Sequence, residues 1–176
     1  RDAQAQTIFD ELLDLVKEKS LGEHEIHIKY SLADLYLRQG KLPEAHALLV
    51  EAAQLTQVMK AKTHFPEIYA IGAQLKLAEK DFEAAHRTIQ LSLQWAEQLG
   101  MAREKGIGQG ILGQVLAAQE KVEGALAAFE QSFAALAQSD RYAAARTQLA
   151  WGWFLVNQSV VEQGRVRLEN AATVFK

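Results

Sequence analysis

The sequence repeats with a period of about 40 residues, and small side chains mark the repeat. Two columns of small residues lie twelve positions apart in each unit. The first holds Ala33, Ala73, Gly113 and Gly152, and the second holds Ala45, Ala85, Ala125 and Gly164. Successive members of the second column are 40, 40 and 39 residues apart. Units of this kind cannot bury their apolar faces alone, so they are expected to stack on one another.

Each unit has the pattern of two helices, here called helix A and helix B. A column of large apolar residues follows the second small-residue column by four residues: Leu49, Ile89, Phe129 and Leu168. This spacing places the large column and the second small column on one face of helix B. Alanine, leucine, glutamine and glutamate dominate a chain with only two prolines, which favours helix throughout. The sequence therefore predicts an all-α fold of about nine helices. We expect a right-handed α-solenoid of stacked antiparallel helix pairs, with helix A lining the concave side.

The period also predicts how the chain is divided. We expect a single array in which residues 1–22 form helix B of a truncated unit, followed by units 23–62, 63–102, 103–140 and 141–176. The turn inside each full unit is placed at 40–41, 80–81, 120–121 and 158–159. Gly22 and Gly100 are predicted C-terminal caps, Pro66 a first-turn residue, and Ser139-Asp140 an N-terminal cap. Because the helical pattern runs into both ends, we interpret the chain as a piece of a longer protein.

The stretch GIGQGILG, residues 106–113, carries the G-x-G-x-x-G spacing of a dinucleotide-binding loop. That loop requires a preceding strand, whereas a helix end precedes it here, and Gly113 already belongs to the small-residue column. We interpret these glycines as packing residues. Three glycines in one helix each cost up to about 1 kcal/mol, so this helix is expected to be the softest, as a hinge or merely tolerated.

Several classes of function lack support in the sequence. The chain has no cysteine, a net charge of -3 and no apolar run of membrane-spanning length, so we expect a cytoplasmic protein that binds neither nucleic acid nor membrane. His24 and His27 could face one metal ion, but no third ligand is evident, and we interpret them as surface histidines. No catalytic constellation is recognisable. We therefore expect no enzyme activity, no metal and no cofactor.

The combined columns resemble the tetratricopeptide repeat. The first full unit matches best, at Ala33, Tyr36, Gly40, Leu42, Ala45, Leu49 and Ala52. The period is longer than the usual 34 or so residues, and Lys76 replaces a large residue in the second unit. Long-period repeats of this type are similar to the arrays of bacterial signal-transduction ATPases and maltose-regulator-like transcription activators. A HEAT-like solenoid, with a period of about 40 to 47, is the alternative fold.

The resemblance implies a binding groove on the concave side. In the tetratricopeptide register, the residues of helix A that face the groove are mostly apolar or carry amide side chains, with a charged residue at each end. Such a surface suits an amphipathic helix or an extended apolar segment. Trp153 could act as an anchor there or pack against helix B of its own unit. The residues expected to bind a partner are Tyr30, Asp34, Leu37, Arg38, Gln74, Leu77, Ile107, Gln114, Arg146, Leu149 and Trp153.

Two functions remain open at this stage. The first is a non-catalytic protein-protein interaction segment, or scaffold, of a larger regulatory or signalling protein, which binds a partner or another domain of its own chain. The alternative is a domain of a transcription regulator or signal-transduction ATPase that senses a small-molecule effector. We also expect self-association through the N-terminal helix, where apolar residues such as Phe9 would lack a cover.

Overall fold

The computed structural model describes residues 2–19 and 21–175, and within them the chain is helical with no strand. The predicted units also include residues 1, 20 and 176, which lie outside the described residues. The helices are α1 (Asp2–Glu18), α2 (Gly22–Arg38), α3 (Leu42–Met59), the 3₁₀ turn η1 (Lys62–His64), α4 (Phe65–Ala78), α5 (Phe82–Gln98), α6 (Ala102–Ala118), α7 (Val122–Leu136), α8 (Arg141–Asn157) and α9 (Val161–Val174).

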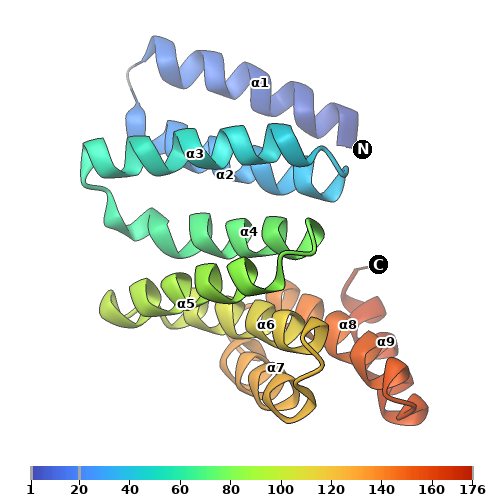
Figure 1. Cartoon of the computed structure of the whole chain (residues 1–176). Coiled ribbons are helices and arrows are strands. Elements are labelled where there is room, and N and C mark those ends of the chain that lie inside the picture. Colours follow the sequence, from blue (N-terminus) through green and yellow to red (C-terminus); the bar gives the residue numbers. More distant parts are fainter. Residues whose placement is uncertain (1, 20, 176) are drawn as a thin grey trace.

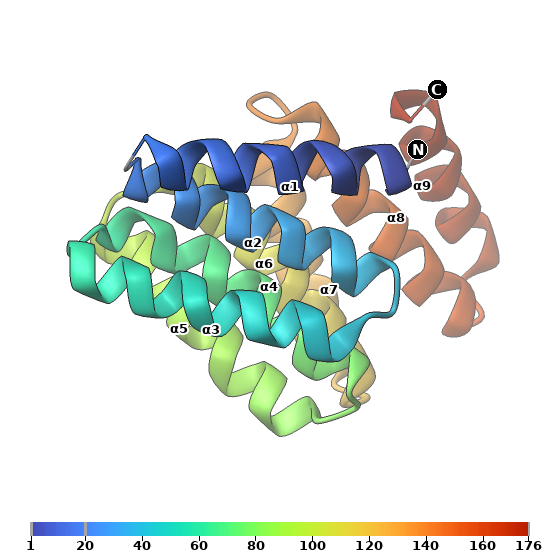
Figure 2. The same ribbon diagram turned by 90° about the horizontal axis from the view of Figure 1, so that it is seen from above.

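The helices pack as consecutive antiparallel pairs. The most extensive contacts lie within α2–α3, α4–α5, α6–α7 and α8–α9, while α1 packs mainly on α2. Figure 1 shows α1 at one end of the stack and α8 and α9 at the other, and Figure 2 shows the pairs fanning out when seen from above. The first helices of successive pairs also contact one another. The predicted all-α solenoid of nine helices is confirmed for the described residues.

The small-residue columns lie where helices meet. Ala33, Ala73, Ala45, Ala85 and Ala125 have no exposed surface, and the glycines of both columns are buried as well. In the last pair the backbones nearly touch, since a Cβ on Gly164 would lie 2.8 Å from the carbonyl oxygen of Gly152. The predicted reason for the period is therefore confirmed: small residues allow the helices of each pair to approach closely.

Each turn inside a pair uses one residue with left-handed backbone. Gly40, Lys80, Glu120 and Ser159 have φ values of 74°, 63°, 60° and 64°. At each turn this residue and the next donate their N–H groups back to the end of the preceding helix, as Gly40 does to Leu37 and Lys41 does to Tyr36. This bonding is a Schellman motif, which satisfies carbonyls that the helix end leaves free.

The predicted helix boundaries were mostly correct. Gly100 has a φ of 66° after α5, Pro66 lies in the first turn of α4, and Asp140 caps α8 by accepting a 2.9 Å hydrogen bond from the Ala143 amide. The prediction for Gly22 was wrong, because Gly22 begins α2 instead of ending α1. A Cβ at Gly22 would lie 2.5 Å from the sulfur of Met59, whose flexible and partly exposed side chain would have to move.

The glycines of α6 are packing residues, as interpreted from the sequence. Gly106, Gly108, Gly110 and Gly113 are all buried, in a helix that contacts α4, α5, α7 and α8. A Cβ on any of them would lie closer than 3.0 Å to a neighbouring side chain, such as Phe129 for Gly113. Gly108 faces α5, while Gly106, Gly110 and Gly113 face α7 and α8, so the missing side chains let helices approach α6 closely from two sides.

Candidate functional site

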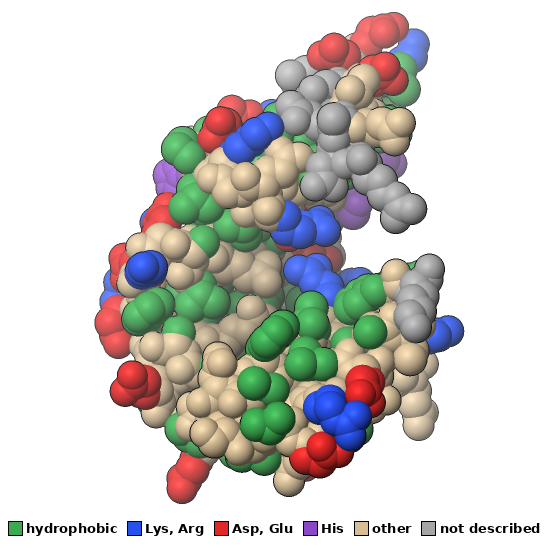
Figure 3. All heavy atoms as spheres, turned by 90° about the vertical axis from the view of Figure 1, so that its right-hand side faces the viewer, with side chains coloured by type: hydrophobic (Ala, Val, Ile, Leu, Met, Phe, Trp, Pro, Cys, Tyr) green, Lys and Arg blue, Asp and Glu red, His purple; other side chains and the backbone are tan. Residues whose placement is uncertain are grey.

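A cavity of about 330 Å³ opens on the concave side of the solenoid. Figure 3 shows this side as a hollow, with lysine and arginine side chains at its edge. The first helix of every pair contributes to its wall. We call this site the concave groove, lined by His27, Tyr30 and Asp34 of α2; Glu67, Ala70, Ile71 and Gln74 of α4; Arg103, Ile107, Gly110, Ile111 and Gln114 of α6; and Asp140, Tyr142, Ala143, Arg146 and Thr147 at the start of α8.

The structure brings together six of the eleven residues expected to bind a partner: Tyr30, Asp34, Gln74, Ile107, Gln114 and Arg146. The other five, Leu37, Arg38, Leu77, Leu149 and Trp153, do not line the cavity. Leu37, Arg38 and Leu77 lie in the last turn of α2 or α4, beyond the cavity, which faces the earlier turns. On α8 only the N-terminal half faces the cavity, so Leu149 and Trp153 lie too far along the helix.

Trp153 also does not pack as a core residue. Its side chain is 56% exposed, and Leu149, one turn earlier, is 40% exposed. An exposed fraction this high is not that of a side chain packed into the interface with α9, the alternative considered for Trp153. The two side chains are exposed apolar groups of α8 outside the cavity.

The groove contains two charged residues that the sequence did not predict, Arg103 and Asp140, and also Glu67, which the repeat register places on the concave face. Arg103 precedes Ile107 by one helical turn, and Glu67 likewise precedes Ile71, so helical spacing places each pair on one face. This spacing was a usable signal. The sequence did not indicate that the groove reaches the first turn of α6 and the N-terminal cap of α8.

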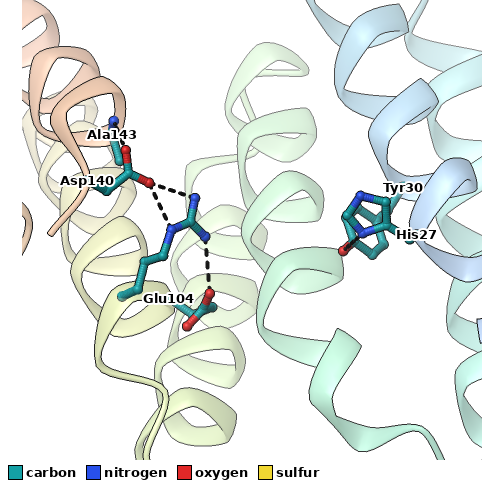
Figure 4. A network of polar contacts seen from close by, with 6 residues as sticks. His27, Tyr30, Glu104, Asp140 and Ala143 are labelled. Atoms are coloured by element: carbon teal, nitrogen blue, oxygen red, sulfur yellow. Dashed lines mark hydrogen bonds and ion pairs between the residues drawn. The ribbon is translucent and has the colours of Figure 1, made fainter. Parts of the chain in front are cut away.

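Arg103 joins α6 to the start of α8. Its Nε and Nη2 atoms lie 2.8 and 2.7 Å from Oδ2 of Asp140, and Nη1 lies 3.1 Å from Oε1 of Glu104. Figure 4 shows this network on one side of α4, with His27 and Tyr30 on the other. The Ala143 amide and then, against the opposing effect of burial, the Arg103 guanidinium hold the pKa of Asp140 below its usual value. The guanidinium is thus held by two carboxylates of its own chain.

Tyr30 forms the α2 wall and is almost fully buried. Its hydroxyl lies 2.5 Å from Nδ1 of His27, and the two rings meet edge to face. Burial, followed by the charge of Glu67, raises the pKa of Tyr30. The hydroxyl is therefore a neutral group whose hydrogen bond to His27 fixes its position.

Glu67 is a charged group of the groove with one unsatisfied oxygen. Its Oε2 atom is shielded from solvent and meets no hydrogen-bond donor among the described residues. Burial, followed by repulsion from Glu104, raises the pKa of Glu67 from 4.5 to about 7. Close to neutral pH this carboxyl group therefore exists in both charged and neutral forms.

The floor of the groove explains one glycine of α6. Ser132 of α7 and Thr147 of α8 share a buried 2.8 Å hydrogen bond, and a Cβ on Gly110 would lie 2.9 Å from both hydroxyl oxygens. Gln114 lies one turn further along and donates a long, 3.5 Å hydrogen bond to the Gly110 carbonyl. Gly110 thus allows two neighbouring pairs to meet beneath the cavity.

No group of three or more metal-binding side chains occurs among the described residues. His27 contacts Tyr30 through Nδ1, as described above, and His24 is exposed. Across residues 2–19 and 21–175, none of the helices combines the length and apolar character needed to cross a bilayer.

Comparison with known proteins identifies the fold alone. No family model matches the chain, and no curated protein sequence matches it. Among solved structures, it is similar to the crystal structure of BtubC (BKLC) from P. vanneervenii, with a TM-score of 0.71 and 18% sequence identity. The superposition covers 99% of this chain and 72% of BtubC. The chain therefore shares an all-helical architecture with BtubC.

Proposed function

We propose that this chain is a non-catalytic binding segment of a larger regulatory or signalling protein in the cytoplasm, and that the concave groove holds an extended segment of a protein partner. The observation that carries the proposal is that all four first helices contribute to one wall. The tetratricopeptide-like register points to the same face, through Tyr30, Gln74 and Gln114.

The shape of the groove favours an elongated occupant. Neighbouring packed helices lie about 8–10 Å apart, so the three steps from α2 to α8 span roughly 24–30 Å. An extended peptide covers that distance with about eight residues. A volume of about 330 Å³ spread over such a length suits a narrow chain better than a compact molecule.

The chemistry of the wall also suits a peptide. Gln74 and Gln114 offer amide groups from two successive helices, and an extended backbone can use both as donors or acceptors. Ala70, Ile71 and Ile107 supply apolar surface between the polar groups. This mixture of apolar wall and few polar groups is common in recognition sites.

Peptide selection tests the proposal. A displayed library of random twelve-residue peptides is selected on the wild-type chain and, in parallel, on Gln74→Arg, which places a long cation on the groove wall. Gln94→Arg, at an exposed position of α5 outside the groove, is the matched control. We expect peptides that bind the wild type and Gln94→Arg equally and Gln74→Arg at least tenfold more weakly. Selected peptides that bind Gln74→Arg as tightly as they bind the wild type would contradict the proposal.

One observation favours the effector-sensing alternative. The cavity volume lies at the lower end of the range for small-molecule sites, about 300–1,000 Å³. A thermal-shift screen of common metabolites separates the two functions. A metabolite that raises the Tm of the wild type but not of Gln74→Arg would support a sensor.

A further inference from the structure

We propose that the occupant of the concave groove places a lysine or arginine side chain against Glu67, whose carboxylate is the specificity-determining anion of the site. This inference rests on the proposed function and names the chemistry of the partner. It begins from Oε2 of Glu67, which is shielded from solvent and has no donor among the described residues. A shielded carboxylate oxygen without a donor is costly, and an incoming cation that donates hydrogen bonds reduces that cost.

Among the described residues no cation donates to Oε2 of Glu67. Arg103 is the cation whose charge reaches Glu67, and its guanidinium is bonded to Asp140 and Glu104. Arg38, in the last turn of α2 beyond the cavity, is paired with Asp34 at 2.5 Å. Tyr30 is a neighbour of Glu67, but its hydroxyl is engaged with Nδ1 of His27. Arg103 and Tyr30 therefore have partners of their own, and Arg146, which also lines the groove, is not among the charges that shift the pKa of Glu67.

The surroundings of Glu67 suit a long basic side chain. Ala70, Ile71 and Ile107 line the groove beside it and offer apolar surface to a methylene stem, while the charged end reaches the carboxylate. Tyr30 presents an aromatic ring on the α2 side, a favourable neighbour for a cation. A basic residue would thus be held along its stem and at its tip.

The raised pKa of Glu67, about 7, makes the proposal testable by pH. Only the ionised form pairs with a cation, so binding strengthens as pH rises through 7. The ionised fraction grows about tenfold between pH 6 and pH 8, and the apparent affinity grows with it. A partner that accepted a hydrogen bond from protonated Glu67 would instead bind more weakly at pH 8.

Other titratable groups face the same space, and the experiment must separate them from Glu67. They are His27, Tyr30 and Asp34 from α2, His64 from η1, Arg103 and Glu104 from α6, and Asp140, Tyr142 and Arg146 at the start of α8. Among the described residues, α3 and α5 contribute none to the groove wall. The ratio of wild-type to Glu67→Gln affinity at each pH isolates Glu67, because the histidines are present in both proteins.

The test uses the peptides selected on the wild-type chain, with affinities measured by fluorescence polarisation at pH 6 and pH 8. The chain offers a closely matched control, since Glu67 and Glu44 each follow a proline in the first turn of a helix, and Glu44 is exposed on α3. We expect Glu67→Gln to weaken binding at pH 8 by at least about tenfold, and Glu44→Gln to leave it unchanged. Circular dichroism checks that both variants are folded.

The outcomes distinguish this inference from the proposed function. Selected peptides enriched in lysine or arginine, with the wild-type advantage over Glu67→Gln growing from pH 6 to pH 8, support it. Peptides that depend on Gln74 yet lack a basic residue, or that bind Glu67→Gln equally well, overturn it while leaving the proposed function intact. Carbon-13 NMR of the Glu67 carboxyl supplies a second readout, because a bound cation must lower its pKa.

Discussion

Glu67 combines an unfavourable position in the folded chain with a useful one for recognition. Its carboxyl group is held in the concave groove without a donor on Oε2, and burial together with Glu104 raises its pKa to about 7. Binding sites often retain groups that reduce stability in this way. The cost of Glu67 in the unoccupied chain is therefore measurable separately from any ligand.

Replacing Glu67 by glutamine is expected to stabilise the chain at high pH. Between the ordinary pKa of 4.5 and the folded value of about 7, the folded state holds the extra proton, so the free energy of unfolding falls as pH rises through that range. Glutamine does not ionise, so in Glu67→Gln the free energy of unfolding does not fall in this way. Because the side chain is partly exposed, we expect a gain of about 1–2 kcal/mol at pH 8 and little at pH 4.

Urea denaturation at the two pH values measures the effect, with Glu44→Gln as the control that should show no such gain. Equal stability of wild type and Glu67→Gln at pH 8 would mean that the buried carboxyl imposes no cost.

The sequence predicted which face of each helix lines the groove, but it did not predict which turns of the helix border the cavity. Tyr30, Gln74 and Gln114 were predicted because helical spacing fixes which face carries them. Arg103 and Asp140 were missed because the angle between successive pairs decides which turns border the cavity. That angle arises from packing along the whole stack, and no local spacing encodes it.

At the level of the elements, the turns inside the pairs share one backbone conformation but not one residue type. A left-handed φ is easy for Gly40, whereas Lys80, Glu120 and Ser159 adopt it against the preference of L-amino acids. The sequence predicted the turn positions from the period. The left-handed residue was evident only at Gly40.

Lys80→Gly is expected to raise the free energy of unfolding by up to about 1 kcal/mol. The left-handed conformation costs a side-chain-bearing residue about 1–2 kcal/mol, and the greater freedom of glycine in the unfolded chain offsets part of the gain. Thermal denaturation measures the change. The reverse substitution, Gly40→Ala, should lower stability through the backbone alone, because a Cβ there meets nothing within 4 Å.

Gly113→Ala is expected to destabilise the chain by about 1–3 kcal/mol, although alanine is the better helix former. Its Cβ would lie 2.6 Å from the ring of Phe129, which is fully buried and cannot move aside easily. Gly72→Ala in α4 is the comparison, since its Cβ would make an ordinary 3.4 Å contact with Thr88. If Gly113→Ala proved as stable as Gly72→Ala, the glycines of α6 would not be packing residues.

For the whole molecule, the repeat period alone predicted the architecture. Small residues every 40 positions are the condition for close pairs, and the structure places both columns at helix crossings.

The N-terminal surface was predicted less accurately. Phe9 is only partly exposed, whereas Ile8, Leu12 and Leu15 of α1 are 56%, 38% and 47% exposed. These three residues lie on one helical face.

We predict that this face of α1 drives self-association, because contiguous exposed apolar surface favours contact between molecules. Light scattering should show an average mass that rises with protein concentration. The double variant Ile8→Lys and Leu15→Glu should remain monomeric, while the same substitutions at Val161 and Val166, two exposed valines of α9, should not. A wild-type chain whose mass stays constant would refute the prediction.

The concave groove takes its walls from four helices spread over residues 27–147. None of the units, excised by itself, would contain the site. Loss or insertion of a unit within this range would exchange one wall of the groove for another. Point substitutions can therefore change the chemistry of the groove, whereas losing one of these four units would remove a wall of it.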